Sequence, residues 1–193
     1  MSVKLTNITK AFGEKTVIKN FSLNIEKGGR LALVSPSGSG KTTLFRIISG
    51  LEKRFDGERL VKGNVSFMFQ EDRLFETSTV LENVLAVAEK KVDEAKELLE
   101  KLALGDYIDA YPADLSGGMR RRVALARTLI YDADIFLLDE CFTGLDEETR
   151  ESVAEVINFY TKGKTLLLIT HDKTEAELLD AELLITDTYI TKK

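Results

Sequence analysis

A glycine-rich segment between two apolar stretches is the feature that most constrains this chain. Residues 31–34 are apolar, residues 37–43 read Ser-Gly-Ser-Gly-Lys-Thr-Thr, and residues 44–48 are typical of a helix. A strand, a glycine-rich loop and a helix in this order are the context of a phosphate-binding loop. Glycines let the backbone approach phosphate closely, and the helix N-terminus adds positive potential. In such a loop Lys41 reaches the β- and γ-phosphates, and the Thr42 hydroxyl is a ligand of Mg²⁺.

This loop departs from the pattern G-x-x-x-x-G-K-[ST] at its first position, where Ser35 replaces glycine. Pro36 biases Ser35 towards an extended conformation, which a serine adopts without strain. The alternative is a flexible surface loop, and the flanking strand and helix patterns disfavour it. We expect these residues to bind the phosphates: Ser35, Pro36, Ser37, Gly38, Ser39, Gly40, Lys41, Thr42 and Thr43.

Composition and charge exclude several classes of protein. The formal net charge of the 193 residues is −5, which gives no support for general binding to nucleic acid. The single cysteine, Cys141, excludes an intramolecular disulfide and fits a reducing compartment. No apolar run approaches the roughly 20 residues that span a bilayer, and the first residues are too polar for a secretory signal. We therefore expect a soluble chain with no nucleic-acid partner, held at a membrane only by another protein.

Hydrophobic periodicity predicts an α/β fold. Residues 3–9 and 17–25 alternate apolar and polar side chains, as half-buried antiparallel strands do. Residues 135–138 and 166–169 are short apolar runs, typical of buried parallel strands, and residues 147–160 between them form an amphipathic helix. Strands that alternate with helices indicate a parallel sheet.

A helical pattern over residues 80–104 and 123–130 interrupts this sheet. One face of the first stretch carries four apolar residues: Val92, Ala95, Leu99 and Leu102. We therefore expect the 193 residues to form a single domain in two parts. A P-loop NTPase core with a mainly parallel sheet and an N-terminal antiparallel β subdomain occupies about residues 1–79 and 131–193. A helical subdomain occupies about residues 80–130.

Two acidic residues, Asp139 and Glu140, follow the apolar run 135–138. In a parallel sheet, ligands bind at the carboxyl ends of the strands. An aspartate there holds Mg²⁺ through water, and the next glutamate orients or deprotonates an attacking water. Alone, such a pair is more often a helix N-cap. In a chain that also carries the phosphate loop around Lys41, the catalytic interpretation is favoured.

A second glycine motif indicates the family. Residues 115–119 read Leu-Ser-Gly-Gly-Met before a helix-like stretch, which resembles the LSGGQ signature of ATP-binding-cassette (ABC) ATPases. Other ABC motifs are matched in the family's order: Phe12 matches the aromatic A-loop residue, Gln70 the Q-loop, residues 143–146 the D-loop, and His171 the switch histidine.

The resemblance implies that the chain binds and hydrolyses ATP together with Mg²⁺. The implied catalytic residues are Lys41, Glu140 as the general base, and His171 as a hydrogen-bonding partner of the γ-phosphate. The implied metal ligands are Thr42, Gln70 and Asp139. Outside the phosphate loop, the implied ATP contacts are Phe12, which stacks on adenine, and Gln70.

The resemblance also implies a head-to-tail dimer with two ATP molecules between the subunits. Each ATP is bound in trans by signature and D-loop residues of the other subunit: Ser116, Gly117, Gly118, Met119 and Asp146. That subunit is a second copy of the chain or, in a heterodimer, a paralogous cassette. Integral membrane permease subunits are the other implied partners, with residues 71–87 as the docking segment. The chain is then a peripheral subunit at the cytoplasmic face of the cell membrane.

Residues 65–84 are similar to the nitrate, sulfonate and taurine importer group of ABC ATPases. Ser35 and Met119, which replace the usual glycine and glutamine, motivate one alternative, a nucleotide-gated regulatory module with little hydrolysis. A non-transport ABC ATPase is another. At the level of single residues, Ser116-Gly117-Gly118 is alternatively a plain helix cap, and we expect the Arg121 side chain to be solvated at the start of its helix.

Overall fold

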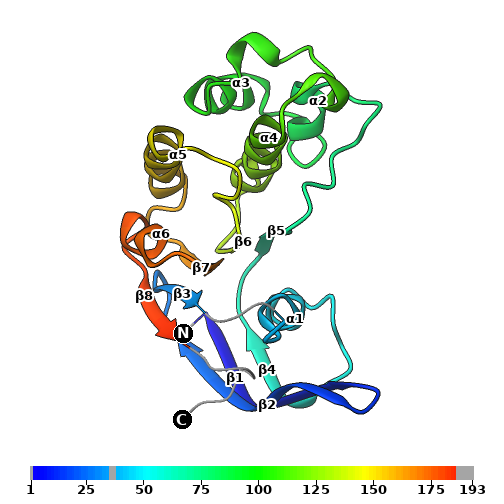
Figure 1. Ribbon diagram of the computed structural model, residues 1–193, viewed down its shortest axis with the longest axis vertical. Helices are drawn as coiled ribbons and strands as arrows, with labels where there is room; N and C mark the ends of the chain where they lie inside the picture. The colour runs from blue at the N-terminus through cyan, green and yellow to red at the C-terminus, as the bar shows by residue number, and fades with distance from the viewer. Residues whose placement is uncertain (1, 35–37, 186–193) are drawn as a thin grey trace. The chain divides into compact units, whose positions relative to one another are not determined.

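The computed structural model describes residues 2–34 and 38–185, and these fall into two compact units (Figure 1). The first, here called the sheet unit, comprises the described parts of Met1–Phe67, Ala133–Asp139 and Gly163–Lys193. The second, the helical unit, comprises Met68–Asp132 and Glu140–Lys162. In the described ranges, none of the helices combines the length and the apolar character needed to cross a bilayer.

The sheet unit contains two sheets. The smaller is antiparallel, has the order β2-β1-β4, and consists of β1 (Val3–Phe12), β2 (Lys15–Ile25) and β4 (Asp56–Val61). The larger has the order β5-β6-β7-β3-β8 and consists of β3 (Arg30–Val34), β5 (Val65–Met68), β6 (Ile135–Asp139), β7 (Thr165–Thr170) and β8 (Glu182–Ile185). The pairs β3–β7, β3–β8 and β6–β7 are parallel. The predicted α/β fold class, with a parallel sheet and an N-terminal antiparallel sheet, is confirmed.

Both sheets of this unit pack around helix α1 (Lys41–Ile48). One cluster joins buried side chains of the antiparallel sheet, such as Ile8 and Phe21, to Phe45 of α1 and to Leu33 and Leu137 of the parallel sheet. Burying each of these side chains contributes about 1.5–3 kcal/mol. The strand and the helix on either side of the phosphate loop are therefore anchored in one core. Helix α6 (Lys173–Leu178) and β8 are the last described elements of this unit.

The helical unit is built from α2 (Val80–Leu85), α3 (Val92–Lys101), two short 3₁₀ helices (Gly105–Tyr107 and Pro112–Asp114), α4 (Gly117–Ile130) and α5 (Glu147–Tyr160). Helices α2, α3 and α4 pack against one another, as Figure 1 shows.

The continuous helical pattern predicted over residues 80–104 is wrong in one respect, because the helix is interrupted at residues 86–91. None of these six residues is buried, so a continuous helix would gain no packing energy there. Val92 is also exposed, whereas Ala95, Leu99 and Leu102 of the same predicted face are buried.

Asn83 of α2 is completely buried and fixes the turn that precedes its helix. Its Oδ1 accepts a hydrogen bond from the Phe75 N–H at 2.8 Å. Its Nδ2 donates to the carbonyls of Phe75, Ser78 and Thr79 at 3.0, 3.1 and 3.0 Å. Because unpaired buried polar groups are costly, this amide fixes the backbone of Phe75, Ser78 and Thr79 around it.

Candidate nucleotide-binding site

The phosphate loop leads into α1 through a position that only glycine can occupy. Gly40 is the N-cap of α1 with φ of 97°, and a Cβ built there would lie 2.5 Å from the Val17 carbonyl oxygen. Its own carbonyl accepts the first helical hydrogen bond, from the Leu44 N–H at 2.9 Å. Ser39 and Lys41 are buried beside it. The backbone is thereby held close to the core, with the N-terminus of α1 at the end of the loop.

Three residues that we predict to bind phosphate, Ser35, Pro36 and Ser37, lie outside the described residues. Of the other predicted loop residues, Gly38 has φ of 76°, and Thr42 and Thr43 are half-buried in the first turn of α1.

The carboxyl ends of β3, β6 and β7 lie at one edge of the parallel sheet. Val34 is in register with Thr170, and Asp139 with Ile169. His171 follows β7 directly and is exposed. The sheet topology therefore brings the phosphate loop, Asp139 and His171 to the same edge, where α/β proteins bind their ligands.

Thr42 and Asp139 contact each other directly at this edge. The Thr42 hydroxyl donates a hydrogen bond to Asp139 Oδ2 at 2.8 Å, and Asp139 is only 1% exposed. A hydroxyl and a carboxylate are hard oxygen donors of the kind that Mg²⁺ takes when phosphate oxygens complete its coordination. These two side chains therefore fit the predicted metal site. The third predicted ligand, Gln70, belongs to the helical unit.

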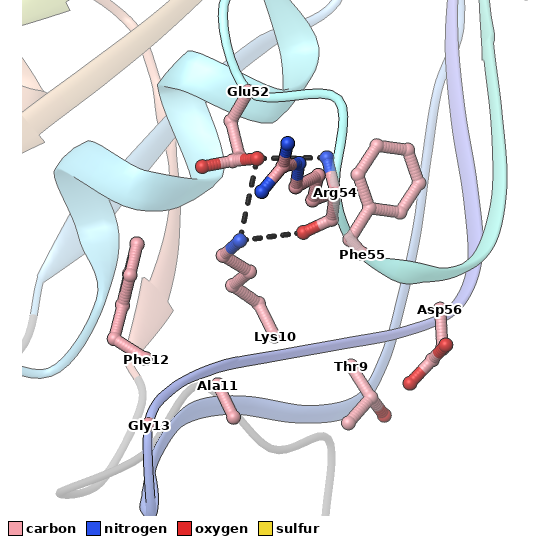
Figure 2. A pocket seen from close by; sticks show the side chains of 9 residues that line it. All are labelled: Thr9, Lys10, Ala11, Phe12, Gly13, Glu52, Arg54, Phe55 and Asp56. Carbon is pink, nitrogen blue, oxygen red and sulfur yellow. Dashed lines mark hydrogen bonds and ion pairs between the residues drawn. The ribbon is translucent and has the colours of Figure 1, made fainter.

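Phe12 lies at the end of β1, beside a cavity of about 720 Å³ between the antiparallel sheet and residues 52–56 (Figure 2). The residue is 53% exposed, and the Lys10 ammonium lies 4.5 Å from the centroid of its ring. The buried Lys10 is held by the Arg54 carbonyl at 2.6 Å and by Glu52 at 3.3 Å. Lys10 thus contacts the Phe12 ring from one side, while about half of the Phe12 surface stays available for stacking.

We predict that Phe12→Ala weakens ATP binding by roughly tenfold, because stacking between a base and an aromatic ring contributes about 1–3 kcal/mol. Titration calorimetry with a non-hydrolysable ATP analogue measures this change. Phe12→Tyr is the matched control, because it retains the ring and should bind as the wild type does. Equal affinities of the alanine variant and the wild type would contradict a stacking role.

In the helical unit, Gln70 and Glu140 contact each other directly. Gln70 Nε2 donates to Glu140 Oε2 at 3.1 Å. Glu140 has φ of 53°, in the left-handed region that non-glycine residues rarely adopt. The predicted Q-loop residue Gln70 and Glu140, which follows β6, thus interact through their side chains, and the backbone of Glu140 has an unusual conformation.

The signature residues form the start of α4. Ser116 is its N-cap, and its hydroxyl accepts a hydrogen bond from the Met119 N–H at 3.3 Å. Ser116 and Gly117 are exposed, and Gly118 and Met119 are partly exposed. A Cβ on Gly117 would meet nothing within 4 Å, whereas one on Gly118 would lie 3.2 Å from the Gly144 carbonyl oxygen. The motif thus caps the helix and also presents its N-terminal end to solvent.

Asp146 is the N-cap of α5, with Oδ1 accepting a hydrogen bond from the Thr149 N–H at 2.8 Å. The hydrogen bonds from Thr149 hold the pKa of Asp146 below its usual value. The side chain that we predict to contact ATP in trans therefore caps its own helix in the isolated chain.

The expectation that Arg121 is solvated is wrong. Its side chain is buried and donates to the backbone carbonyls of Phe69, Gln70 and Glu140. The sequence contains a signal for this burial, because Arg121 lies four and seven residues before Leu125 and Thr128, both buried on α4.

A phosphate loop after a central parallel strand, with an aspartate bound to its threonine from a second strand, defines a P-loop nucleotide-binding domain. The family model described as "ABC transporter" matches residues 18–143. The chain belongs to this family.

Two curated relatives support the assignment. Aliphatic sulfonates import ATP-binding protein SsuB of Bacillus subtilis strain 168 is 40% identical over 203 residues, with 96% of this chain and 80% of the relative covered. SsuB of Bacillus cereus strain ZK / E33L is 38% identical over 203 residues, with 96% and 81% covered.

Solved structures agree with this assignment. A dimeric bacterial ABC transporter cassette superposes with a TM-score of 0.88 at 30% identity, and the match covers 98% of this chain and 97% of that one. A dimeric post-hydrolysis state of the same cassette, bound to ADP and phosphate, gives the same values. The chain is thus an ABC ATPase that binds adenine nucleotide.

Proposed function

We propose that this protein is the ATP-hydrolysing subunit of an ABC import system for organic sulfonates or related oxyanions. The contact between the Thr42 hydroxyl and Asp139 at the phosphate-loop edge carries the ATPase part of the proposal. The import part rests on the relatives, whose names describe import of aliphatic sulfonates. Substrate selection itself belongs to the permease and to any binding protein.

Hydrolysis proceeds by in-line attack of water on the γ-phosphate. Backbone N–H groups of the phosphate loop and the Lys41 ammonium neutralise charge on the β- and γ-phosphates. Glu140 accepts the proton of the attacking water, Gln70 orients Glu140 and the water, and His171 hydrogen-bonds the γ-phosphate. Thr42, Asp139 and Gln70 would hold Mg²⁺, which would supply additional positive charge at the phosphate oxygens.

The active assembly in this proposal is an ATP-dependent dimer. Ser116, Gly117, Gly118 and Met119 present a helix N-terminus to the phosphates bound by the other subunit, with Asp146 beside them. The dimeric cassettes that superpose on this chain support such an arrangement. Because two identical surfaces meet, the interface closes with twofold symmetry. A homodimer is the simplest assembly, and a paralogous cassette is the alternative partner.

The proposed partner in the membrane is a permease, which makes this protein a peripheral subunit on the cytoplasmic side. Residues 71–87 are the proposed docking segment, with Phe75 54% exposed and Val87 43% exposed. Asp72 is an unsuitable position for testing docking by charge reversal, because its carboxylate lies 3.0 Å from the buried Arg121. Arg73 is better, because its side chain is 48% exposed and pairs only with the exposed Glu71 among the ion pairs described.

Steady-state phosphate release tests this function. We expect the purified chain to hydrolyse MgATP, and detergent-solubilised permease from the same transport system to increase the rate. Lys41→Ala, which lacks the phosphate-binding ammonium, provides the background rate. Tight ATP binding without phosphate release, with or without permease, would instead support the second candidate, a nucleotide-gated regulatory module. This second candidate is motivated by two departures from the usual motifs, Ser35 in place of glycine and Met119 in place of glutamine.

A further inference from the structure

We propose that Arg121 is a positioning residue for hydrolysis, which holds the Gln70–Glu140 pair in its working arrangement through backbone contacts. The inference rests on the proposed function, because it takes Glu140 to be the general base. The guanidinium of Arg121 donates to the backbone carbonyls of both residues and so acts on the peptide groups that carry their side chains.

The guanidinium of Arg121 binds both members of the pair. Nε and Nη2 donate to the Glu140 carbonyl at 3.2 and 2.8 Å. Nη1 donates to the carbonyls of Phe69 and Gln70 at 2.9 and 2.8 Å and to Asp72 Oδ1 at 3.0 Å. One guanidinium therefore binds residues more than 60 positions apart in the chain, and Arg121 as a whole is only 4% exposed.

Glu140 needs such a contact because its backbone is in the left-handed region, with φ of 53°. That conformation costs a non-glycine residue about 1–2 kcal/mol and persists only where the surroundings determine it. Two hydrogen bonds from one charged group to the Glu140 carbonyl fix the orientation of its peptide. They thereby fix the direction in which the carboxylate leaves the backbone towards Gln70 Nε2, 3.1 Å away.

Only an arginine has the geometry for all these contacts. A guanidinium offers five donors in a rigid plane, so separate edges bind the Glu140 carbonyl and the Phe69–Gln70 backbone at once. Lysine is a single point charge on a flexible stem and cannot bind both segments in this way. Asp72 supplies the opposite charge, and its own carbonyl is held by Arg127 Nη2 at 2.9 Å, so the buried charge is paired in a fixed geometry.

The test compares Arg121→Met and Arg121→Lys with the wild type in steady-state ATP hydrolysis by the full chain. For Arg121→Met we expect kcat to fall at least about tenfold while KM for ATP changes by less than about threefold, because misplacement of a catalytic group affects chemistry more than binding. Arg121→Lys, which retains the charge and the contact to Asp72, should recover only part of the rate.

Arg120→Met is the matched control. Arg120 is the neighbouring arginine of α4, and it binds Glu76 and the Pro112 carbonyl instead.

A double-mutant cycle separates positioning from simple loss of stability. If Arg121 acts through Glu140, then adding Arg121→Met to Glu140→Gln should lower the residual rate by less than about twofold, because the group that it positions is already disabled. A further tenfold loss in the double variant would overturn the inference, as would a wild-type rate for Arg121→Met. A wild-type rate for Glu140→Gln alone would overturn the role of Glu140 as general base and the inference with it, whereas absence of phosphate release by the wild type would overturn the proposed function. Fluorescent-nucleotide binding by each variant must stay within about threefold of the wild type, and failure of Arg121→Met to bind would assign Arg121 a folding role only.

Discussion

Glu140→Gln is expected to leave a protein that binds ATP and hydrolyses it at least about 100-fold more slowly, because a general base contributes roughly 10²–10⁴-fold to such rates. The substitution keeps the shape of the side chain and removes its basicity. The local geometry tolerates it, since the amide oxygen can still accept the hydrogen bond that Gln70 Nε2 donates to Glu140 Oε2. Single-turnover phosphate release with excess enzyme measures the loss directly.

Glu147→Gln provides the matched control, because it makes the same chemical change in the first turn of α5, where the side chain is exposed. It should hydrolyse ATP at the wild-type rate. With MgATP, the Glu140→Gln protein should accumulate as an ATP-bound dimer, whereas the wild type should be a monomer or weak dimer with ADP. Hydrolysis by Glu140→Gln at the wild-type rate would show that another group activates the water.

Gly117→Asp is expected to abolish that dimer. In the proposed assembly the substitution places a carboxylate where α4 faces the phosphates bound by the other subunit, and like charges at such short range oppose closure. The fold itself should tolerate the change, because a Cβ on Gly117 meets no atom within 4 Å. An acidic residue in the first turn of a helix is also favourable for that helix. Sedimentation velocity of the Glu140→Gln background with MgATP measures the loss of dimer.

Gly117→Ala adds the same Cβ without charge and should still dimerise. Gly118→Asp, one residue further, is a less clean test, because its Cβ already lies 3.2 Å from the Gly144 carbonyl oxygen and crowding would add to repulsion. An ATP-bound dimer of Gly117→Asp with undiminished affinity would refute the head-to-tail arrangement. Loss of dimer in both the alanine and the aspartate variants would point to steric crowding instead.

The parts of the fold that the sequence predicts correctly are those with strong local periodicity. The buried strands around residues 135–138 and 166–169 and the helix over 147–160 are all present. Strand β4 (Asp56–Val61) was not predicted, because none of its residues is buried and its pattern carries no apolar periodicity. It forms because β1 offers it a hydrogen-bonding edge, which no local pattern reports.

The candidate site also has features that the sequence predicts and features that it does not. A motif with fixed spacing predicts a contact such as that between Thr42 and Asp139, which lie 97 residues apart in sequence. The error at Arg121 arose because a run of three arginines at a helix start is usually solvated. Its spacing to Leu125 and Thr128 does indicate a buried face, but the backbone carbonyls of two distant segments that make burial of the charge possible cannot be identified from the sequence. The left-handed backbone conformation of Glu140 could not be predicted from the sequence either, because tertiary contacts impose it.

The dependence of the turn at residues 75–79 on Asn83 determines how this segment could be transferred to another protein. The turn is held by a side chain eight residues from its start and by backbone bonds from Val80 and Leu81 to the carbonyls of Ala110 and Ile108. Any sequence supplies those backbone groups, whereas the buried asparagine is specific to this sequence, as are the capping box between Thr79 and Glu82 and the ion pair between Glu76 and Arg120. A turn exchanged between related ATPases would therefore keep its shape only if the asparagine were transferred with it, which makes residues 75–83 the natural unit of such an exchange.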